Sequence, residues 1–256
     1  MIWVGSLRRV VRIFLILIFC LLMYALGVVI KIITLPCPQK RYKFLYPATS
    51  FWGYGMAWLM GMRIKVEGPR PRAPFFLVSN HLSYMDILLV CAVCPAWFIS
   101  KSEVASWPGI GPLTRIGPTI YINREIRRDV KRMNQLIADL VLNGGAVGFF
   151  PEGTTTNGEE LLPFKPSLFQ PAVEMGLAVT TAAIAYETRP GMPPVTDVIA
   201  WYGDEEFAPH IARLLKEPGF TVRIRFGEQT ITASDRKELA LLTYAQIQKD
   251  LDHLKG

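Results

Sequence analysis

The chain has 256 residues, of which 51% are hydrophobic and 19% charged, and its formal net charge is +7. This composition excludes a disordered chain, and the length is enough for one sizeable core. The positive charge suits nucleic acid, an anionic membrane surface or an anionic substrate. Because the sequence has no zinc-finger spacing, glycine-rich phosphate loop or dense Lys/Arg tract, we expect no nucleic-acid partner.

The first predicted element is an apolar helix at the membrane. The segment from Ile13 to Ile30 carries no charge. As a helix it would reach about 27 Å, against the ~30 Å of a hydrocarbon core, so its length fits a spanning helix or one held in a single leaflet. Positive charges flank it on both sides, without the asymmetry typical of a spanning helix. They are Arg8, Arg9, Arg12, Lys31, Lys40, Arg41 and Lys43.

A second apolar stretch, "FWGYGMAWLMGM" from Phe51, contains two tryptophans and a tyrosine but is too short to span. Two apolar segments with cationic flanks and interfacial aromatic residues suit a helical hairpin embedded in the cytoplasmic face of a membrane. A single-pass anchor is the alternative. Both interpretations predict a membrane-bound protein whose folded domain lies on the cytoplasmic side.

The four cysteines predict neither a disulfide framework nor a metal site. Cys91 and Cys94 form a C-x-x-C with apolar neighbours and no second such pair, so we interpret them as buried thiols. Together with Cys20 and Cys37 they indicate a reducing, cytosolic environment.

After Gly68 the pattern changes to short β-type runs that alternate with helical stretches. The predicted strands are Phe75–Ser79, Trp97–Ser100, Thr119–Ile122, Ala146–Phe150, Ala178–Tyr186 and Thr221–Phe226. The predicted helices are Asp86–Ala92, Arg124–Leu142, Leu168–Met175, Glu205–Leu215 and Ala233–Leu254. This order predicts an α/β fold with a central, mostly parallel or mixed sheet flanked by helices. We expect residues 1–67 to form the membrane anchor and residues 68–256 the catalytic domain.

The stretch "SNHLSYMD", from Ser79 to Asp86, lies between two apolar runs and contains one of only three histidines, His81. Ser83 and Asp86 fit S-x-x-D, a capping box that would begin the following helix. A loop that turns at Ser83 can bring His81 back to the Asp86 carboxylate. An Asp bound to one imidazole nitrogen would leave the other as a general base.

Two later stretches also end predicted strands with polar residues. In "YINR", Arg124 would emerge at the edge of the sheet, where its guanidinium suits bidentate phosphate binding; the alternative is a surface residue of a charged helix. In "FFPEGTTTNG", Glu152, Gly153 and Thr154 follow an apolar strand, and such a loop can offer backbone N–H groups and hydroxyls to an anion. Its alternative is a simple polar turn.

Together, "NHLSYMD", "YINR" and "FFPEGTTTNG" resemble, in order, three sequence blocks of the lysophosphatidate (1-acylglycerol-3-phosphate) acyltransferase family. The resemblance runs from about Asn80 to Tyr186. It implies that His81 and Asp86 are catalytic and that Arg124 contacts the acceptor's phosphate. It also implies that the segment from Glu152 to Thr154 lines the acceptor site. Lys101 and Lys165 are further candidate contacts for a phosphate or an acyl thioester.

The resemblance implies transfer of a fatty acyl group from acyl-CoA or acyl carrier protein to the free hydroxyl of a membrane lysolipid. The first candidate acceptor is 1-acylglycerol-3-phosphate, which would give phosphatidic acid. No metal or other cofactor is required, because a thioester is already activated. Thr155 stands where many relatives have a basic residue, and Thr181 and Ala182 stand where a proline is usual. The first departure argues against a bare phosphate monoester, and the stretches "SKSEVASWPGIGPL" and "LPFKPSLF" are similar to ones in lyso-ornithine lipid and other lysophospholipid acyltransferases. Lyso-ornithine lipid or another lysophospholipid is therefore the alternative acceptor.

Three other classes of protein are alternatives to an acyltransferase. A lipid hydrolase would need an activated serine, and the sequence has no G-x-S-x-G elbow. A metal phosphatase would need clustered His and Asp ligands, whereas His210 and His253 lie late in the chain. A non-enzymatic lipid-binding protein would fit the charge and the apolar end, but it predicts that His81 is dispensable.

Overall fold

The computed structural model describes residues 2–37, 41–106, 119–122 and 127–256. Its α-helices are α1 Ile2–Ile33, α2 Arg41–Met60, α3 Met85–Val93, α5 Arg127–Leu142, α6 Gln170–Glu174, α7 Val195–Val198, α8 Phe207–Leu214 and α9 Arg236–Lys255. Its strands are β1 Met62–Glu67, β2 Phe75–Ser79, β3 Trp97–Lys101, β4 Thr119–Ile122, β5 Ala146–Phe149, β6 Val179–Thr188 and β7 Phe220–Phe226. Short 3₁₀ helices cover Ser102–Ser106 (η2) and Pro166–Phe169 (η3).

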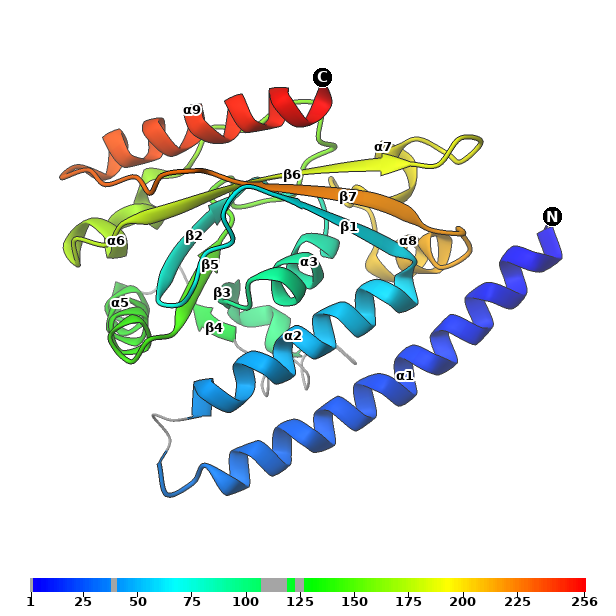
Figure 1. Ribbon diagram of the computed structural model, residues 1–256, viewed down its shortest axis with the longest axis horizontal. Coiled ribbons are helices and arrows are strands. Elements are labelled where there is room, and N and C mark those ends of the chain that lie inside the picture. Colours follow the sequence, from blue (N-terminus) through cyan, green and yellow to red (C-terminus); the bar gives the residue numbers. More distant parts are fainter. Residues whose placement is uncertain (1, 38–40, 107–118, 123–126) are drawn as a thin grey trace.

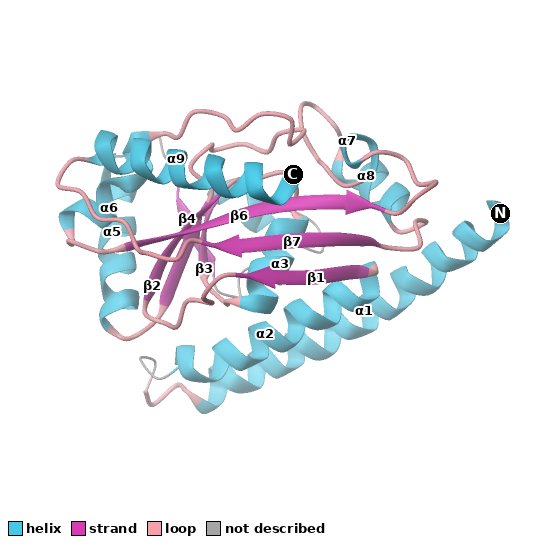
Figure 2. Cartoon of the chain, turned by 45° about the horizontal axis from the view of Figure 1, so that its top comes forward, coloured by secondary structure: helices cyan, strands magenta, loops and turns pink. Residues whose placement is uncertain are grey.

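The seven strands form one mixed sheet in the order β1-β7-β6-β2-β5-β3-β4. The pairs along it are parallel, except for the antiparallel pair of β6 and β7. The strand β2 is buried at every residue because it lies inside the sheet with helices on both faces. This arrangement confirms the predicted α/β fold, and Figure 2 shows the strands at the centre of the domain.

Two apolar layers hold the helices to the sheet. One lies between the sheet and α2, α3 and α8, and it includes Leu89, Ile184 and Ile224. The other lies under α5, α6 and α9, and it includes Ile137 and Phe169. Figure 1 shows α9 on one side of the sheet and α2 on the other, with α1 outside α2.

The two N-terminal helices lie side by side as an antiparallel hairpin (Figures 1 and 2). Of the described helices, α1 is long and apolar enough to cross a membrane, over Trp3–Ile33. Only 6% of its most apolar stretch of 18 residues is buried in the protein. The rings of Phe19 in α1 and Phe51 in α2 meet edge to face at 5.9 Å. The guanidinium of Arg12 also donates to the Glu217 carbonyl at 2.6 Å, which ties α1 to the segment after α8.

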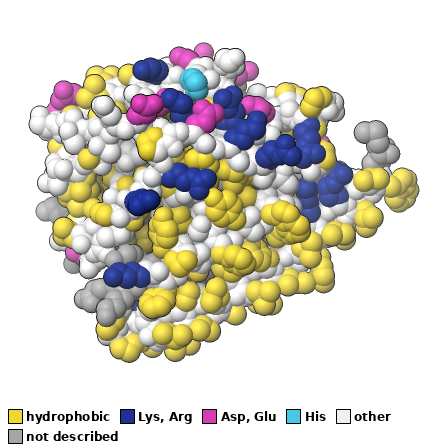
Figure 3. Space-filling view, viewed as in Figure 1, with side chains coloured by type: hydrophobic (Ala, Val, Ile, Leu, Met, Phe, Trp, Pro, Cys, Tyr) yellow, Lys and Arg dark blue, Asp and Glu magenta, His cyan; other side chains and the backbone are white. Residues whose placement is uncertain are grey.

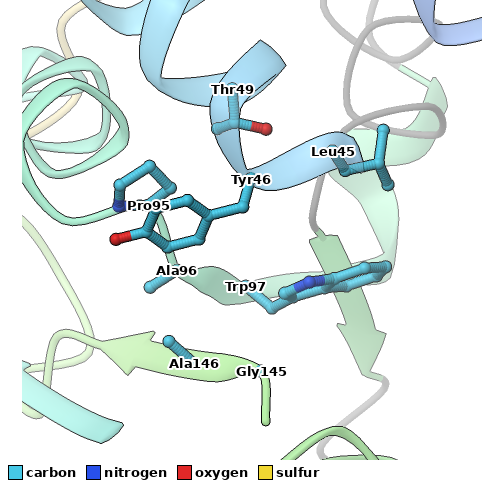
Figure 4. A pocket seen from close by; sticks show the side chains of 8 residues that line it. All are labelled: Leu45, Tyr46, Thr49, Pro95, Ala96, Trp97, Gly145 and Ala146. Atoms are coloured by element: carbon cyan, nitrogen blue, oxygen red, sulfur yellow. The ribbon is translucent and has the colours of Figure 1, made fainter. Parts of the chain in front are cut away.

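The helix α2 packs against α3 and against the amino ends of β3 and β5. At Gly53 a Cβ atom would clash with the backbone nitrogen of Ala92, so only glycine allows this approach of α2 to α3. Figure 4 shows Tyr46 and Thr49 of α2 over Trp97 and Ala146, near the amino ends of β3 and β5. The carboxyl ends of β2 and β5 are therefore on the edge that α2 leaves uncovered.

The predicted strands agree with the observed ones to within two residues, but β1 and the short α7 were not predicted. Strand β1 pairs with β7, so residues just before Gly68 belong to the sheet. The division of the chain after residue 67 stays a prediction. The predicted helix Leu168–Met175 is a 3₁₀ turn followed by the five-residue α6.

Candidate active site

Polar loops meet at the carboxyl ends of three neighbouring parallel strands. His81 follows β2, Glu152 follows β5, and Tyr186 lies in the last third of β6. The first loop is fastened to β6 by Asn80, whose side-chain amide exchanges two hydrogen bonds with the backbone of Ile184, at 2.8 and 2.9 Å. This clamp fixes the point at which the chain leaves β2, one residue before His81.

The imidazole of His81 is held by the carboxylate of Asp86. The distance from His81 Nδ1 to Asp86 Oδ2 is 2.7 Å. The same oxygen accepts the backbone N–H groups of Leu82 at 2.7 Å and Ser83 at 3.0 Å. Because Oδ2 acts as an acceptor for both amides, we assign the proton of the ring to Nδ1 and a lone pair to Nε2. The structure thus brings together the predicted pair of side chains.

Tyr186 completes the shell around Asp86. Its hydroxyl donates to Asp86 Oδ1 at 2.5 Å, and Asp86 itself is fully buried. Burial, followed by the nearby Asp86 charge, raises the pKa of Tyr186 well above its usual value, so the phenol keeps its proton. From the described residues the Asp86 carboxylate accepts four hydrogen bonds, a number that suits a buried anion.

One face of the His81 ring is covered by an aromatic stack. The His81 and Phe150 rings are nearly parallel, with centroids 3.8 Å apart, and Phe98 stacks next at 5.6 Å. The His81 side chain is 16% exposed. Within the described ranges no hydrogen bond involves Nε2, so this nitrogen is available to a substrate hydroxyl.

Glu152 supports the backbone of the histidine loop. Its Oε1 accepts the His81 N–H at 2.7 Å and its Oε2 accepts the Leu162 N–H at 3.0 Å. Only 2% of the residue is exposed, and burial raises the pKa of Glu152 to about 7. The predicted contact of Glu152 with an acceptor stays a prediction, since both oxygens bind the protein's own backbone.

The other predicted residues of this loop lie at its exposed rim. Gly153 has a φ of 74°, a left-handed conformation that favours glycine. A Cβ atom there would lie 2.6 Å from Lys165 Nζ, so this ammonium group covers Gly153. Thr154 and Lys165 are exposed. The positions of Arg124 and of the Lys101 side chain lie outside the described residues, and their predicted contacts stay predictions.

A second histidine supports the same loop from α8. His210 is fully buried; its Nδ1 lies 2.8 Å from the Tyr84 hydroxyl and its Nε2 lies 3.1 Å from the Ala200 carbonyl. Burial lowers the pKa of His210, so the neutral ring donates from Nε2 and accepts the Tyr84 proton at Nδ1. The backbone N–H of Trp201 also donates to the Leu82 carbonyl at 2.9 Å. Through Trp201 and His210, α8 and the segment that leads into it therefore hold Leu82 and Tyr84, two residues of the loop between His81 and Asp86.

The predicted capping box is half formed. The Asp86 carboxylate receives the Ser83 N–H, as expected, whereas Ser83 Oγ is buried and has no hydrogen-bond partner in the described structure. The sequence alone does not indicate the roles of Phe150 and Tyr186. Both lie within the stretch that resembles the family, but only the fold brings them to His81 and Asp86.

Comparisons with known proteins identify the family to which this chain belongs. The model of the family described as Acyltransferase matches residues 63–185. The lyso-ornithine lipid O-acyltransferase of Brucella abortus is 38% identical over 204 residues, which are 75% of this chain and 76% of that protein. The 1-acyl-sn-glycerol-3-phosphate acyltransferase of Neisseria meningitidis is 32% identical over 192 residues, covering 74% and 72%.

A solved structure shows the same fold. The 1-acyl-sn-glycerophosphate acyltransferase PlsC of Thermotoga maritima superposes with a TM-score of 0.69, over 97% of this chain and 98% of that one, at 20% sequence identity. The chain therefore belongs to the acyltransferase family, and the predicted resemblance is confirmed.

Proposed function

We propose that the protein is a lysolipid O-acyltransferase in which His81 is the general base. The observation that carries this proposal is that, in the described part of the chain, His81 Nδ1 is held by a protein side chain while Nε2 is not. Asp86 binds that nitrogen, Phe150 covers one ring face, and Nε2 is left free within the described residues. A neutral imidazole so held is suited to accept a proton from a hydroxyl.

In the proposed reaction, His81 Nε2 removes the proton from the acceptor's hydroxyl as its oxygen attacks the carbonyl carbon of an acyl thioester. The C–S bond breaks, and the thiolate leaves with the proton that His81 then returns. The Asp86 anion stabilises the imidazolium formed on the way. Backbone N–H groups of the loop after β5 are candidates for binding the oxyanion. The products are an ester and a free thiol.

The acceptor that we propose first is 1-acylglycerol-3-phosphate. Arg124 and Lys165 are the cations proposed to bind its phosphate, and the relative from Neisseria supports this choice by its name. A second candidate is lyso-ornithine lipid. Two relatives with that activity in their names, from Brucella abortus and Pseudomonas aeruginosa, are 38% and 37% identical, and Thr155 adds no cation to the loop.

We propose acyl-CoA or acyl carrier protein as the donor. We also propose that the N-terminal hairpin holds the active site at the cytoplasmic face of a membrane. The apolar α1 and its antiparallel packing on α2 support membrane association. The net positive charge supports a cytoplasmic position, since anionic lipids give that leaflet a negative surface potential.

The test is thiol release by the purified chain, with one acyl thioester and a panel of lysolipids in detergent micelles. Acyl transfer predicts release only when an acceptor with a free hydroxyl is present, together with formation of the diacyl lipid. Equal release without acceptor would indicate a hydrolase instead. Comparison of 1-acylglycerol-3-phosphate with lyso-ornithine lipid decides between the two acceptors.

A further inference from the structure

The chain's net positive charge comes from its N-terminal end. Residues 1–74 contain eleven lysines and arginines and a single carboxylate, Glu67. Residues 75–256 contain seventeen lysines and arginines and twenty carboxylates. Glu67 is itself paired with Arg223 at 3.0 Å and Arg225 at 3.5 Å. A cationic anchor is thus joined to a mildly acidic domain.

The outer face of α2 carries an apolar strip. Phe44, Phe51 and Trp58 are spaced seven residues apart, so they lie on one face of the helix, and each is more than half exposed. The opposite face of α2, with Leu45 and Met56, is buried. Figure 3 shows hydrophobic side chains along the two N-terminal helices and dark blue cationic side chains above them.

Three exposed cations border this strip on the side of the sheet: Lys43, Arg70 and Arg72, here called the cationic border. Arg70 Nη1 lies 3.4 Å from the hydroxyl of Tyr54 on α2. Lys43 and Arg72 line one surface hollow, although they come from α2 and from the loop between β1 and β2. The border therefore runs along α2, next to the aromatic strip.

The cationic border has the features of a site for anions outside the protein. Among the described residues, no ion pair joins Lys43, Arg70 or Arg72 to a carboxylate. The neighbouring cations of β1 belong to another surface. Ile64 and Val66 pack towards the core beside α2, so the alternating Arg63 and Lys65 side chains point to the other face of the sheet.

We propose that the cationic border binds the headgroups of anionic phospholipids in a bilayer while the strip on α2 enters the acyl region beneath them. The charge complementarity selects an anionic leaflet, and Tyr54 lies between apolar and charged groups, as interfacial tyrosines do. The acidic domain is repelled by the same surface, which favours an orientation with α2 and the border towards the lipid. The three cations of the border are different residues from the predicted phosphate contacts, Arg124 and Lys165.

The experiment offers the full chain two vesicle populations at once as detergent is removed. One population consists of phosphatidylcholine alone. The other is a mixture in which phosphatidylglycerol replaces part of the phosphatidylcholine. The two populations have different densities and are separated by flotation. We expect the wild type to prefer the anionic vesicles, and raised salt to weaken that preference. Replacing all three border cations by glutamine should reduce the partition ratio at least tenfold at low salt, because each charge near such a surface contributes about fivefold.

The matched control replaces Arg236, Lys237 and Lys249 by glutamine. These three exposed cations lie on α9, across the sheet from α2, so the net charge falls equally. The control should partition as the wild type does. Equal losses in both variants, an unchanged ratio in the border variant, or no wild-type preference would each overturn the proposal. Because partition needs no turnover, the outcome is independent of the proposed acyl transfer.

Discussion

The hydroxyl of Tyr186 offers a sharp test of how the His81–Asp86 pair is stabilised. Replacing Tyr186 by phenylalanine removes the only described partner of Asp86 Oδ1, a hydrogen bond of 2.5 Å to a fully buried carboxylate. A hydrogen bond to a charged group contributes about 1.5–3 kcal/mol. At ~2–4 °C per kcal/mol for a chain of this size, we expect the melting temperature to fall by about 3–12 °C.

The same change should lower kcat about tenfold, which corresponds to ~1.4 kcal/mol of lost transition-state stabilisation. The KM values should stay nearly constant, because Tyr186 contacts Asp86 rather than the opening beside His81. Initial rates of thiol release and thermal unfolding in detergent measure both effects. Tyr202, which is 40% exposed, provides the control, and its phenylalanine variant should behave as the wild type. A lower melting temperature with unchanged kcat would refute the electrostatic role assigned to Tyr186.

Three further predictions concern the support of the site. Glu152 holds its proton up to a pH of about 7 in the folded state, against 4.5 in the unfolded chain. The free energy of unfolding should therefore fall by up to ~3 kcal/mol as pH rises through that window, and Glu152→Gln should flatten the slope in pH-dependent denaturant titrations. Tyr84→Phe leaves Nδ1 of the buried His210 without its hydrogen-bond partner. The free energy of unfolding, measured by thermal unfolding, should therefore fall by ~1–3 kcal/mol, while kcat changes only a few fold. Gly53→Ala places a methyl group against the Ala92 backbone, so α2 should separate from α3 and the melting temperature should fall; an unchanged value would contradict the close packing.

Local sequence patterns predicted most of the sheet because buried strands are short apolar runs. The omitted strand β1 is an edge strand in which Arg63 and Lys65 alternate with apolar residues, and it begins two residues after the long apolar helix α2. Without the fold, its polar side chains look like the charged end of the membrane segment. The antiparallel pairing of β6 with β7 likewise depends on contacts far apart in the chain.

The site was predictable where its contacts are local. His81 and Asp86 are five residues apart, and a turn at Ser83 was enough to suggest their contact. Tyr186 is 100 residues from Asp86, and no spacing in the sequence connects a strand tyrosine to that carboxylate. The hydrogen bond from the His81 N–H to Glu152 is unpredictable for the same reason, because it forms only once β2 and β5 have paired.

The most direct measurement of the central claim is the rate of acceptor-dependent thiol release by a His81→Asn variant. The asparagine amide can still donate to Asp86 from nearly the position of Nδ1, but it supplies no base at Nε2. We predict a rate lower by a factor of about 10²–10⁴, with wild-type folding and vesicle binding, whereas the same change at the exposed His253 leaves the rate intact. Near-normal turnover by the folded His81→Asn variant would contradict the assignment of His81 as the general base.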